Sequence, residues 1–187
     1  MPVDAARWER EDGDVQPEGD RPQQDPHRRR LIAAAGRALA AARAGDDNSA
    51  VEGVLRLLID PSEAPAGHRT ARELVLLLFS ECSEMVSSLG SGQSTAVKMQ
   101  VFDDDGQELS IDEADPPVRT AVRTLLAEVN GDDDAAGEQV EIALSSGAPQ
   151  EMASLVQQAL RWTIRLSDEC AARGIPTSEW IASALDL

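Results

Sequence analysis

Short runs of aspartate are the residues of this chain best suited to bind a metal ion. A Gly-Asp-Asp motif occurs at residues 45–47 and again at 131–133, and paired carboxylates are common ligands of Mg²⁺ and Ca²⁺. Both motifs, however, lie between two segments with helical periodicity. At such a junction a glycine in the left-handed conformation ends one helix, and an aspartate caps the next by accepting free backbone N–H groups. We therefore interpret both motifs as helix caps.

A third run, Asp103–Gly106, resembles part of a calcium-binding loop. Such a loop has its invariant glycine at position 6, an aspartate at position 1 and a glutamate at position 12. With Gly106 at position 6, Val101 would occupy position 1 and Asp112 position 12. Because neither residue has the required identity, the spacing argues against calcium.

The histidine and cysteine residues do not have the spacing of a metal or redox site. His27 and His68 have no second His or Cys at ligand spacing, which argues against zinc. Cys82 and Cys170 fall late on two predicted helices, and we interpret them as buried small hydrophobic residues. No carboxylate pair lies within an apolar stripe, where burial would raise its pKa for acid–base chemistry. The sequence thus predicts no catalytic residue, no metal and no cofactor.

One pair of arginines has the spacing needed to bind an anion. Arg161 and Arg165 lie four residues apart on a predicted helix, with Trp162 between them in the sequence. These three residues form a candidate ligand groove, in which the guanidinium groups would hold an anionic or acidic group. The alternative, which we favour, is that the arginines pair with carboxylates of the chain itself.

The charge of the chain is strongly negative and unevenly distributed. Its 187 residues include 34 acidic and 17 basic residues, for a net charge of −17. This balance argues against a general nucleic-acid-binding protein and against binding to an anionic membrane surface. Residues 103–151 hold 14 acidic residues against two arginines. This segment is either a solvated surface that keeps the protein soluble or a surface that attracts a basic partner.

An internal repeat indicates which elements position these residues. The segment that begins at Leu39 aligns with the segment that begins at Leu125, at an offset of 86 residues that superposes the two Gly-Asp-Asp motifs. After a shorter loop in the second copy the offset becomes 81, so that Leu74 matches Leu155. The unbroken offset favours a duplication over chance similarity between alanine-rich helices.

Each copy is predicted to form three helices. Between residues 118 and 129, apolar residues recur at i, i+3, i+4, i+7, i+8 and i+11, the stripe of an amphipathic helix. The third helices of the two copies are predicted over Arg69–Leu89 and Pro149–Ala172. A short C-terminal helix around Trp180 is expected to pack back on the bundle.

The segment between the two copies alternates apolar and polar residues with the period of a β-strand. The residues that share its apolar face are Val97, Met99 and Val101. A three-residue loop ending in Gly106 would pair Val101 with Leu109 and Met99 with Ile111, which keeps the apolar residues on one face. The free edge of this hairpin, at Val97, Met99 and Val101, is a possible homodimer contact.

The predicted fold is mainly α: a helical bundle of two related three-helix units with one inserted β-hairpin. Residues 1–27 are expected to form a disordered tail and residues 28–90 the first unit. Residues 91–112 would form the linker and hairpin, and residues 113–187 the second unit with the short C-terminal helix. The N-terminal residues lack the order of a secretory signal, which predicts a cytoplasmic protein.

For function, the sequence favours a non-enzymatic interaction or regulatory protein that dimerises and presents an acidic surface to a basic protein. The candidate partner-binding residues are Asp103, Asp104, Asp105, Glu108, Asp132, Asp133 and Asp134. Two alternatives stay open. The chain could mimic nucleic acid and inhibit a basic protein, or it could be an enzyme or small-ligand binder with a groove between the two helical units. A groove lined by polar groups that include a buried Arg or Glu would favour the last alternative.

Overall fold

The protein is mainly helical, as predicted. The computed structural model describes residues 25–59, 64–90, 101–102, 107–145 and 149–187. Most of the predicted N-terminal tail and linker lies outside these residues. The helices of the described part are α1 (Pro26–Arg43), α2 (Asp47–Ile59), α3 (Ala64–Leu89), α4 (Pro116–Val129), α5 (Asp133–Ser145), α6 (Pro149–Ala172) and α7 (Glu179–Leu185).

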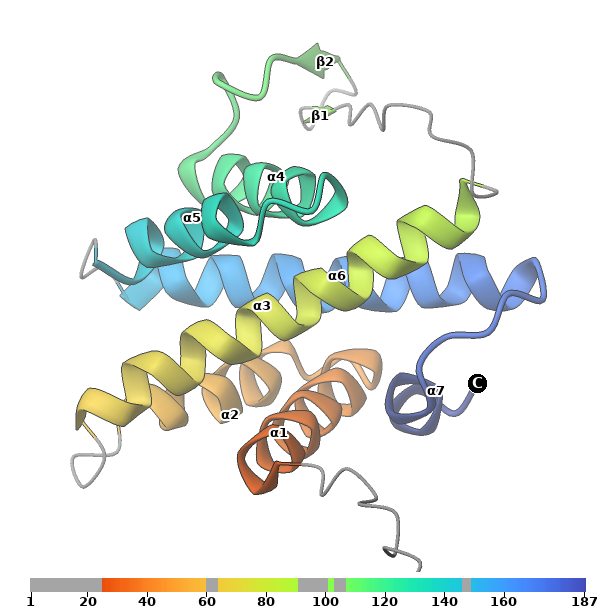
Figure 1. Cartoon of the computed structure of the whole chain (residues 1–187), viewed down its shortest axis with the longest axis horizontal. Helices are drawn as coiled ribbons and strands as arrows, with labels where there is room; N and C mark the ends of the chain where they lie inside the picture. The colour runs from red at the N-terminus through yellow and green to blue at the C-terminus, as the bar shows by residue number, and fades with distance from the viewer. Residues whose placement is uncertain (1–24, 60–63, 91–100, 103–106, 146–148) are drawn as a thin grey trace, which may run out of the picture.

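The two longest helices, α3 and α6, cross at the centre of the molecule (Figure 1). The pair α1 and α2 lies on one side of this crossing and the pair α4 and α5 on the other, while α7 packs against α1. Both α3 and α6 contact helices of each predicted unit. The two predicted units therefore share one core, to which α1–α7 all contribute buried residues.

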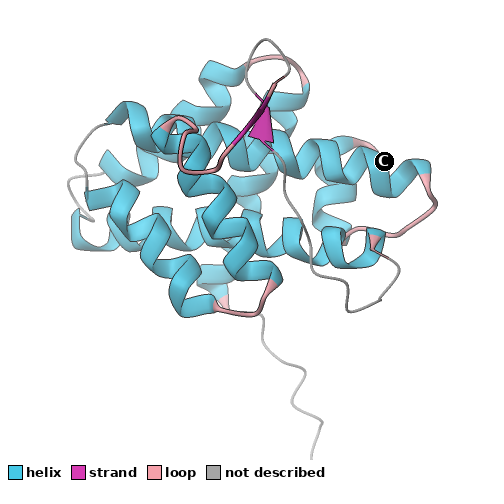
Figure 2. Ribbon diagram, turned by 90° about the horizontal axis from the view of Figure 1, so that it is seen from above, coloured by secondary structure: helices cyan, strands magenta, loops and turns pink. Residues whose placement is uncertain are grey.

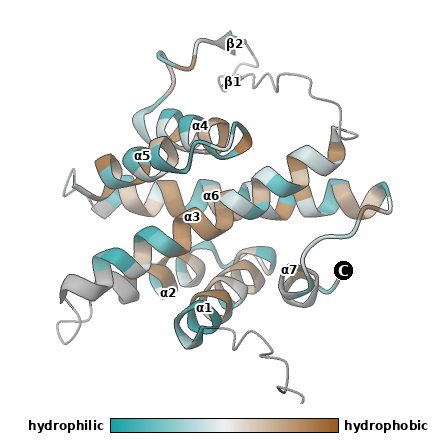
Figure 3. Ribbon diagram, viewed as in Figure 1, coloured by the Kyte–Doolittle hydropathy of each residue, from teal (hydrophilic) through white to brown (hydrophobic). Residues whose placement is uncertain are grey.

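The core is built from the apolar stripes of these helices (Figure 3). Phe79 and Leu78 of α3 and Leu155 and Leu160 of α6 are almost fully buried. Burial of such side chains is the main source of stability in a helical bundle. Because α3 and α6 contribute large residues to the same core, their opposite faces are left to line the surface.

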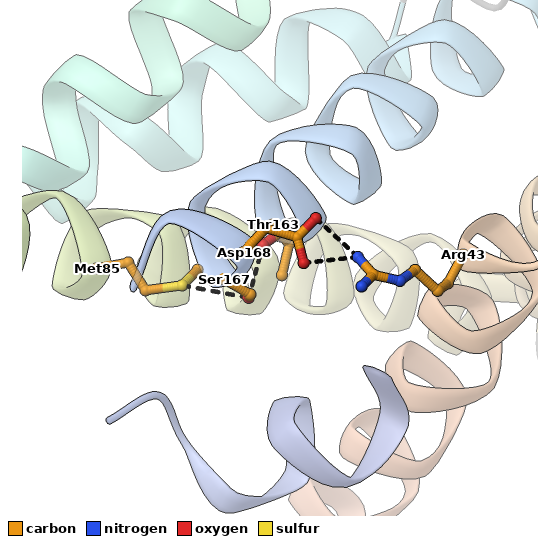
Figure 4. A network of polar contacts seen from close by, with 5 residues as sticks. All are labelled: Arg43, Met85, Thr163, Ser167 and Asp168. Carbon is orange, nitrogen blue, oxygen red and sulfur yellow. Dashed lines mark hydrogen bonds and ion pairs between the residues drawn. The ribbon is translucent and has the colours of Figure 1, made fainter. Parts of the chain in front are cut away.

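A small polar network lies where α3 and α6 meet (Figure 4). Ser167 Oγ donates to the backbone oxygen of Thr163 at 2.7 Å and to Met85 Sδ at 3.4 Å. Nearer the surface, Arg43 Nη1 of α1 lies 2.7 and 2.8 Å from the two carboxylate oxygens of Asp168. These contacts satisfy the polar groups that the crossing buries and tie α1 to α6.

Both Gly-Asp-Asp motifs are helix caps, which confirms their interpretation from the sequence. Gly45 and Gly131 have φ values of 83° and 70°, in the left-handed region that favours glycine. Asp46 Oδ1 then accepts the backbone N–H of Ser49, and Asp132 Oδ1 that of Ala135, each at 3.0 Å. The hydrogen bonds from the Ser49 side chain and backbone hold the pKa of Asp46 below its usual value.

The predicted ends of the two third helices agree with the structure except at the start of α3, and the first unit begins before its predicted start. Helix α6 spans the predicted range Pro149–Ala172, whereas α3 begins at Ala64, five residues before the predicted start. Helix α1 begins at Pro26, because Asp25 caps it by accepting the backbone N–H of His27 at 3.0 Å. His27 therefore lies in the first turn of a helix and not in a tail.

Two strands of two residues each pair antiparallel beside the helical body (Figure 2). They are β1 (Val101–Phe102) and β2 (Glu108–Leu109), and Val101 lies opposite Leu109, the predicted register. Strand β2 ends before Ile111, which lies in a turn where Glu113 N donates to Ser110 O at 3.0 Å. The predicted extension of the strand to Ile111 is therefore wrong. The rest of the predicted hairpin, residues 97–100 and 103–106, lies outside the described residues.

Helix α7 packs back on the bundle, as expected. Ile181 and Leu185 are buried, and Trp180 Nε1 donates to Glu81 Oε1 of α3 at 2.9 Å. This hydrogen bond joins the C-terminal helix to the centre of α3. None of the described helices is both long enough and apolar enough to cross a lipid bilayer.

Candidate functional site

The predicted partner-binding residues are not gathered into one site. Asp103, Asp104 and Asp105 lie outside the described residues, and Glu108 is exposed on β2. Asp132 is engaged as the cap of α5, and Asp133 and Asp134 are exposed in the first turn of that helix. Of these described residues, Asp133 also lines the groove described below.

The predicted ligand groove at Arg161, Trp162 and Arg165 is not formed by these three residues together. Arg161 Nη2 donates to Asp47 Oδ2 at 3.0 Å, so this arginine pairs within the chain, as we favoured. This contact and one from Gln157 hold the pKa of Asp47 below its usual value. Trp162 is half-buried and packs edge-on against Phe79, with 6.1 Å between the ring centroids. Arg165 is exposed, and its side chain makes no polar contact with another described residue.

The predicted hairpin contact between two subunits is not tested by the structure. Val97 and Met99 lie outside the described residues, and Val101 forms part of β1. Dimerisation through this edge stays a prediction.

A groove of about 520 Å³ runs along the outer face of α3, between α1 and the turn that joins α4 to α5. We call it the α3 groove. Six carboxylates and two basic side chains line it, together with a floor of leucines and one serine. The acids are Asp25, Glu73, Glu81, Glu84, Glu128 and Asp133; the bases are His27 and Arg28; the other residues are Leu31, Leu76, Leu77 and Ser80.

Helix α3 supplies half of this lining from one face. Its residues at positions i, i+3, i+4, i+7, i+8 and i+11 all line the groove: Glu73, Leu76, Leu77, Ser80, Glu81 and Glu84. Residues at these spacings share one helix face. The separation of eleven positions between Glu73 and Glu84 corresponds to about 16 Å of helix at a rise of 1.5 Å per residue. In Figure 1, α3 crosses in front of α6, and on this face Glu84 is exposed while Leu76 and Leu77 are half-buried.

Three of the carboxylates are engaged within the protein. Asp25 caps α1, Glu73 forms an ion pair with His27, and Glu81 accepts the indole N–H of Trp180. The residue Glu81 is only 8% exposed, so this hydrogen bond satisfies part of a carboxylate that is largely removed from water.

The other three carboxylates, Glu84, Glu128 and Asp133, have no side-chain partner in the part of the chain that the structure describes. Burial raises the pKa of the Glu128 carboxyl above its usual value, and the negative charge of Asp133 raises it further. Glu128 also lies in the last turn of α4, where the helix dipole is unfavourable to a negative charge. The α3 groove thus carries negative charge that its own residues do not neutralise.

The groove also contains groups that could take part in acid–base chemistry. His27 Nε2 of α1 contacts Glu73 Oε2 of α3. Ser80 lies on the same face of α3 as Glu73. Within the described residues, however, no hydrogen bond joins Ser80 to His27. A serine nucleophile needs a base within hydrogen-bond distance to remove its proton. The described side chains of the groove therefore hold a histidine–carboxylate pair without an aligned nucleophile.

The two cysteines lie outside the groove and are both buried as free thiols. Cys82 Sγ lies 3.3 Å from Thr163 Oγ1 at the α3–α6 crossing. Burial raises the pKa of the Cys82 thiol to about 12 and also raises that of Cys170. A reactive cysteine needs a lowered pKa and access to solvent, so both residues are structural. Among the described residues, no three His, Cys, Asp or Glu side chains are placed to hold one metal ion.

Most residues of the α3 groove could not be identified from the sequence. Glu73, Glu81 and Glu84 lie outside the acidic segment 103–151, in a part of the chain whose acids and bases nearly balance. The one local signal of the groove in the sequence was a stripe of residues at helical spacing on α3, in which glutamates share a helix face with two leucines. No protein-family model, curated protein or solved structure matches this chain. Its function therefore has to follow from the geometry of its own residues.

Proposed function

We propose that this chain is a non-enzymatic interaction protein that binds a basic segment of another protein in the α3 groove. The observation that carries this proposal is the presence of three carboxylates, Glu84, Glu128 and Asp133, without a partner in one groove. A cationic ligand would supply the missing partners. It would also remove the repulsion between Glu128 and Asp133, which the free protein has to tolerate.

The charge of the whole chain supports the same proposal. A net charge of −17 attracts a basic partner over a long range and raises the rate of encounter. The groove would then give this general attraction a defined location. Binding of this kind weakens with added salt, because salt screens charges separated by more than about 10 Å.

The repeat supports a specialised role for the face of α3. We propose that the two halves arose by duplication. The offset of 81 residues then matches three groove residues of α3 with three residues of α6, in this order: Ser80 with Arg161, Glu81 with Trp162, and Glu84 with Arg165. The first Gly-Asp-Asp motif places Asp47 beside Arg161, whereas Asp133 of the second has no basic partner among the described residues. The carboxylates Glu81 and Glu84 that α3 supplies to the groove therefore have no acidic counterpart at the matching positions of α6.

The experiment that tests this proposal compares two double variants of equal net charge. Glu84→Gln with Glu128→Gln removes two groove carboxylates, and Glu108→Gln with Glu138→Gln removes two exposed carboxylates on β2 and α5. Each variant is titrated with oligolysine. The groove pair is expected to weaken binding about tenfold, since two charge contacts of about 0.7 kcal/mol each amount to one decade. Equal weakening by both pairs would mean that only total charge matters and would refute the groove.

A small cationic ligand is the second candidate. The groove volume lies within the range of small-molecule sites, and Glu81 is a buried carboxylate of the kind that binds such a ligand. This proposal expects a diamine or a guanidinium compound to raise the melting temperature at concentrations where a monovalent salt does not. It also expects Glu81→Gln to abolish that shift.

A further inference from the structure

We infer that the basic segment is an amphipathic α-helix that lies along α3. This inference rests on the proposed function and goes beyond it, because it specifies the structure and the residue pattern of the ligand. Two features of the α3 groove carry it: the shape of the exposed face of α3 and the placement of the charges around that face.

The face of α3 in the groove is an unpartnered helix face. Leu74 and Leu78, on another face of α3, are fully buried in the core, whereas Leu76 and Leu77 are only half-buried. These two leucines lie in the middle of the face, and Leu31 of α1, which is only 7% exposed, also lines the groove. Helix α1 and the α4–α5 turn form the two walls. The face is about 16 Å long, with two leucines near its middle and carboxylates at its ends, and it lies between two walls. A groove of this length can accept one face of a helix of three turns.

The charges specify where the ligand helix carries its basic residues. Glu73 and Glu84 lie at the two ends of the face, eleven residues apart, with the leucines between them. The wall at the α4–α5 turn carries Glu128 and Asp133, while the α1 wall carries Arg28. Because Glu73 is already paired with His27, the complementary ligand has an apolar centre, with basic residues at the Glu84 end and along the side that faces the α4–α5 turn.

Other occupants fit the charges less well. Residues 1–24 of this chain precede the groove residue Asp25, but they include seven acidic and only three basic residues. A second copy of the chain would bring its own net charge of −17 into contact with the same charge. Both occupants would add repulsion, so the ligand is a basic helix from a different protein.

The test uses the full chain and three peptides of equal charge and a length of about 12 residues, which spans about 18 Å as a helix. The first peptide contains leucine and lysine in the order that places all leucines on one helix face. The second has the same composition in an order that gives no apolar face, and the third has serine in place of leucine. Fluorescence anisotropy of labelled peptides gives the affinities, and circular dichroism shows whether each peptide gains helix on binding.

The amphipathic peptide is expected to bind about tenfold more tightly than either control and to become helical, because burial of even one leucine side chain is worth about this factor. Glu84→Gln with Glu128→Gln should weaken its binding, and Glu138→Gln should not. Leu77→Gln should reduce the preference for the amphipathic peptide; the repeat has Gln158 at this position, so the fold accepts the residue there.

The possible results separate the inference from the proposed function. Equal affinity for all three peptides, lost with the groove carboxylates, would overturn the helical ligand and leave the basic partner in place. Binding that does not depend on the groove carboxylates would overturn both. If the chain associates with itself, and Glu84→Lys abolishes that association, the occupant is a second copy and the inference is wrong.

Discussion

Replacement of Glu128 by glutamine should stabilise the free protein and weaken its binding of a basic ligand. In the structure this carboxylate is half-buried, faces the like charge of Asp133 and lies in the last turn of α4. Each of these features disfavours the charged form, and glutamine keeps the shape of the side chain while removing the charge. A like-charge contact and an unfavourable helix-end charge are each worth about 0.3–1 kcal/mol. We therefore expect Glu128→Gln to raise the free energy of unfolding by about 1 kcal/mol.

The pH dependence of this gain has a definite sign. The pKa of Glu128 is higher in the folded than in the unfolded protein, so the folded protein holds its proton more tightly. The penalty of the charged carboxylate is complete above the raised folded pKa. It decreases as the pH falls through that pKa and is absent below the ordinary value of 4.5, where the group is protonated in both states. The difference in stability between Glu128→Gln and the unchanged protein should therefore disappear in acid.

Urea denaturation followed by circular dichroism at a series of pH values measures this difference. The same gain should also appear in thermal denaturation. For a chain of this size, 1 kcal/mol corresponds to a rise in melting temperature of about 2–4 °C near neutral pH. The matched control is Glu138→Gln, an exposed glutamate of α5 outside the groove, which should change stability by less than about 0.5 kcal/mol.

The same variant must lose affinity for the amphipathic basic peptide for the reasoning to hold. Opposite effects on stability and binding are typical of a site that keeps an unfavourable charge for the sake of its ligand. If Glu128→Gln destabilised the protein near neutral pH, or if its gain persisted below the ordinary glutamate pKa, Glu128 would not be an unpaired charge. The electrostatic account of the groove would then be refuted.

Three further predictions concern the fold. Gly45→Ala and Gly131→Ala should each lower the free energy of unfolding by about 1–2 kcal/mol, because both positions have a positive φ. A negligible loss of stability in urea denaturation would contradict the left-handed caps. Gly137→Ala should be nearly neutral, since the gain in helix propensity is offset by displacement of the Arg72 guanidinium, whose Cζ would lie 3.2 Å from the new Cβ. In an Arg72→Ala background the same change should stabilise by up to about 1 kcal/mol, and a double-mutant cycle without coupling would argue against this contact. The Cys82 thiol should react with a thiol reagent only on unfolding, and fast labelling of the native protein would show that it is not buried.

Local signals in the sequence were sufficient to predict most of the helices. Gly45 and Gly131 with their following aspartates mark helix junctions, because capping depends on residues within one turn of each other. Pro149 marks the start of α6 for the same reason. The start of α1 had an equally local signal, Asp25 before Pro26, but it lies in a polar stretch that resembled the rest of the tail.

The site could not be predicted from charge along the chain. The segment 103–151 holds most of the net charge, yet the groove takes its carboxylates from α3, from the α4–α5 turn and from the cap of α1. Which carboxylates come together depends on how the helices pack, and this is set by apolar contacts distant in the sequence. Arg161 illustrates the same point, since its partner Asp47 lies more than one hundred residues away.

The central claim is that a basic ligand binds in the α3 groove, and methyl NMR of the leucines tests it most directly. The groove floor contains Leu31, Leu76 and Leu77, and Leu160 of α6 is buried in the core as an internal control. On titration with the amphipathic basic peptide, the methyl signals of the three groove leucines should shift together and saturate, while that of Leu160 stays in place. Shifts confined to other parts of the surface, with the groove leucines unchanged, would contradict the account.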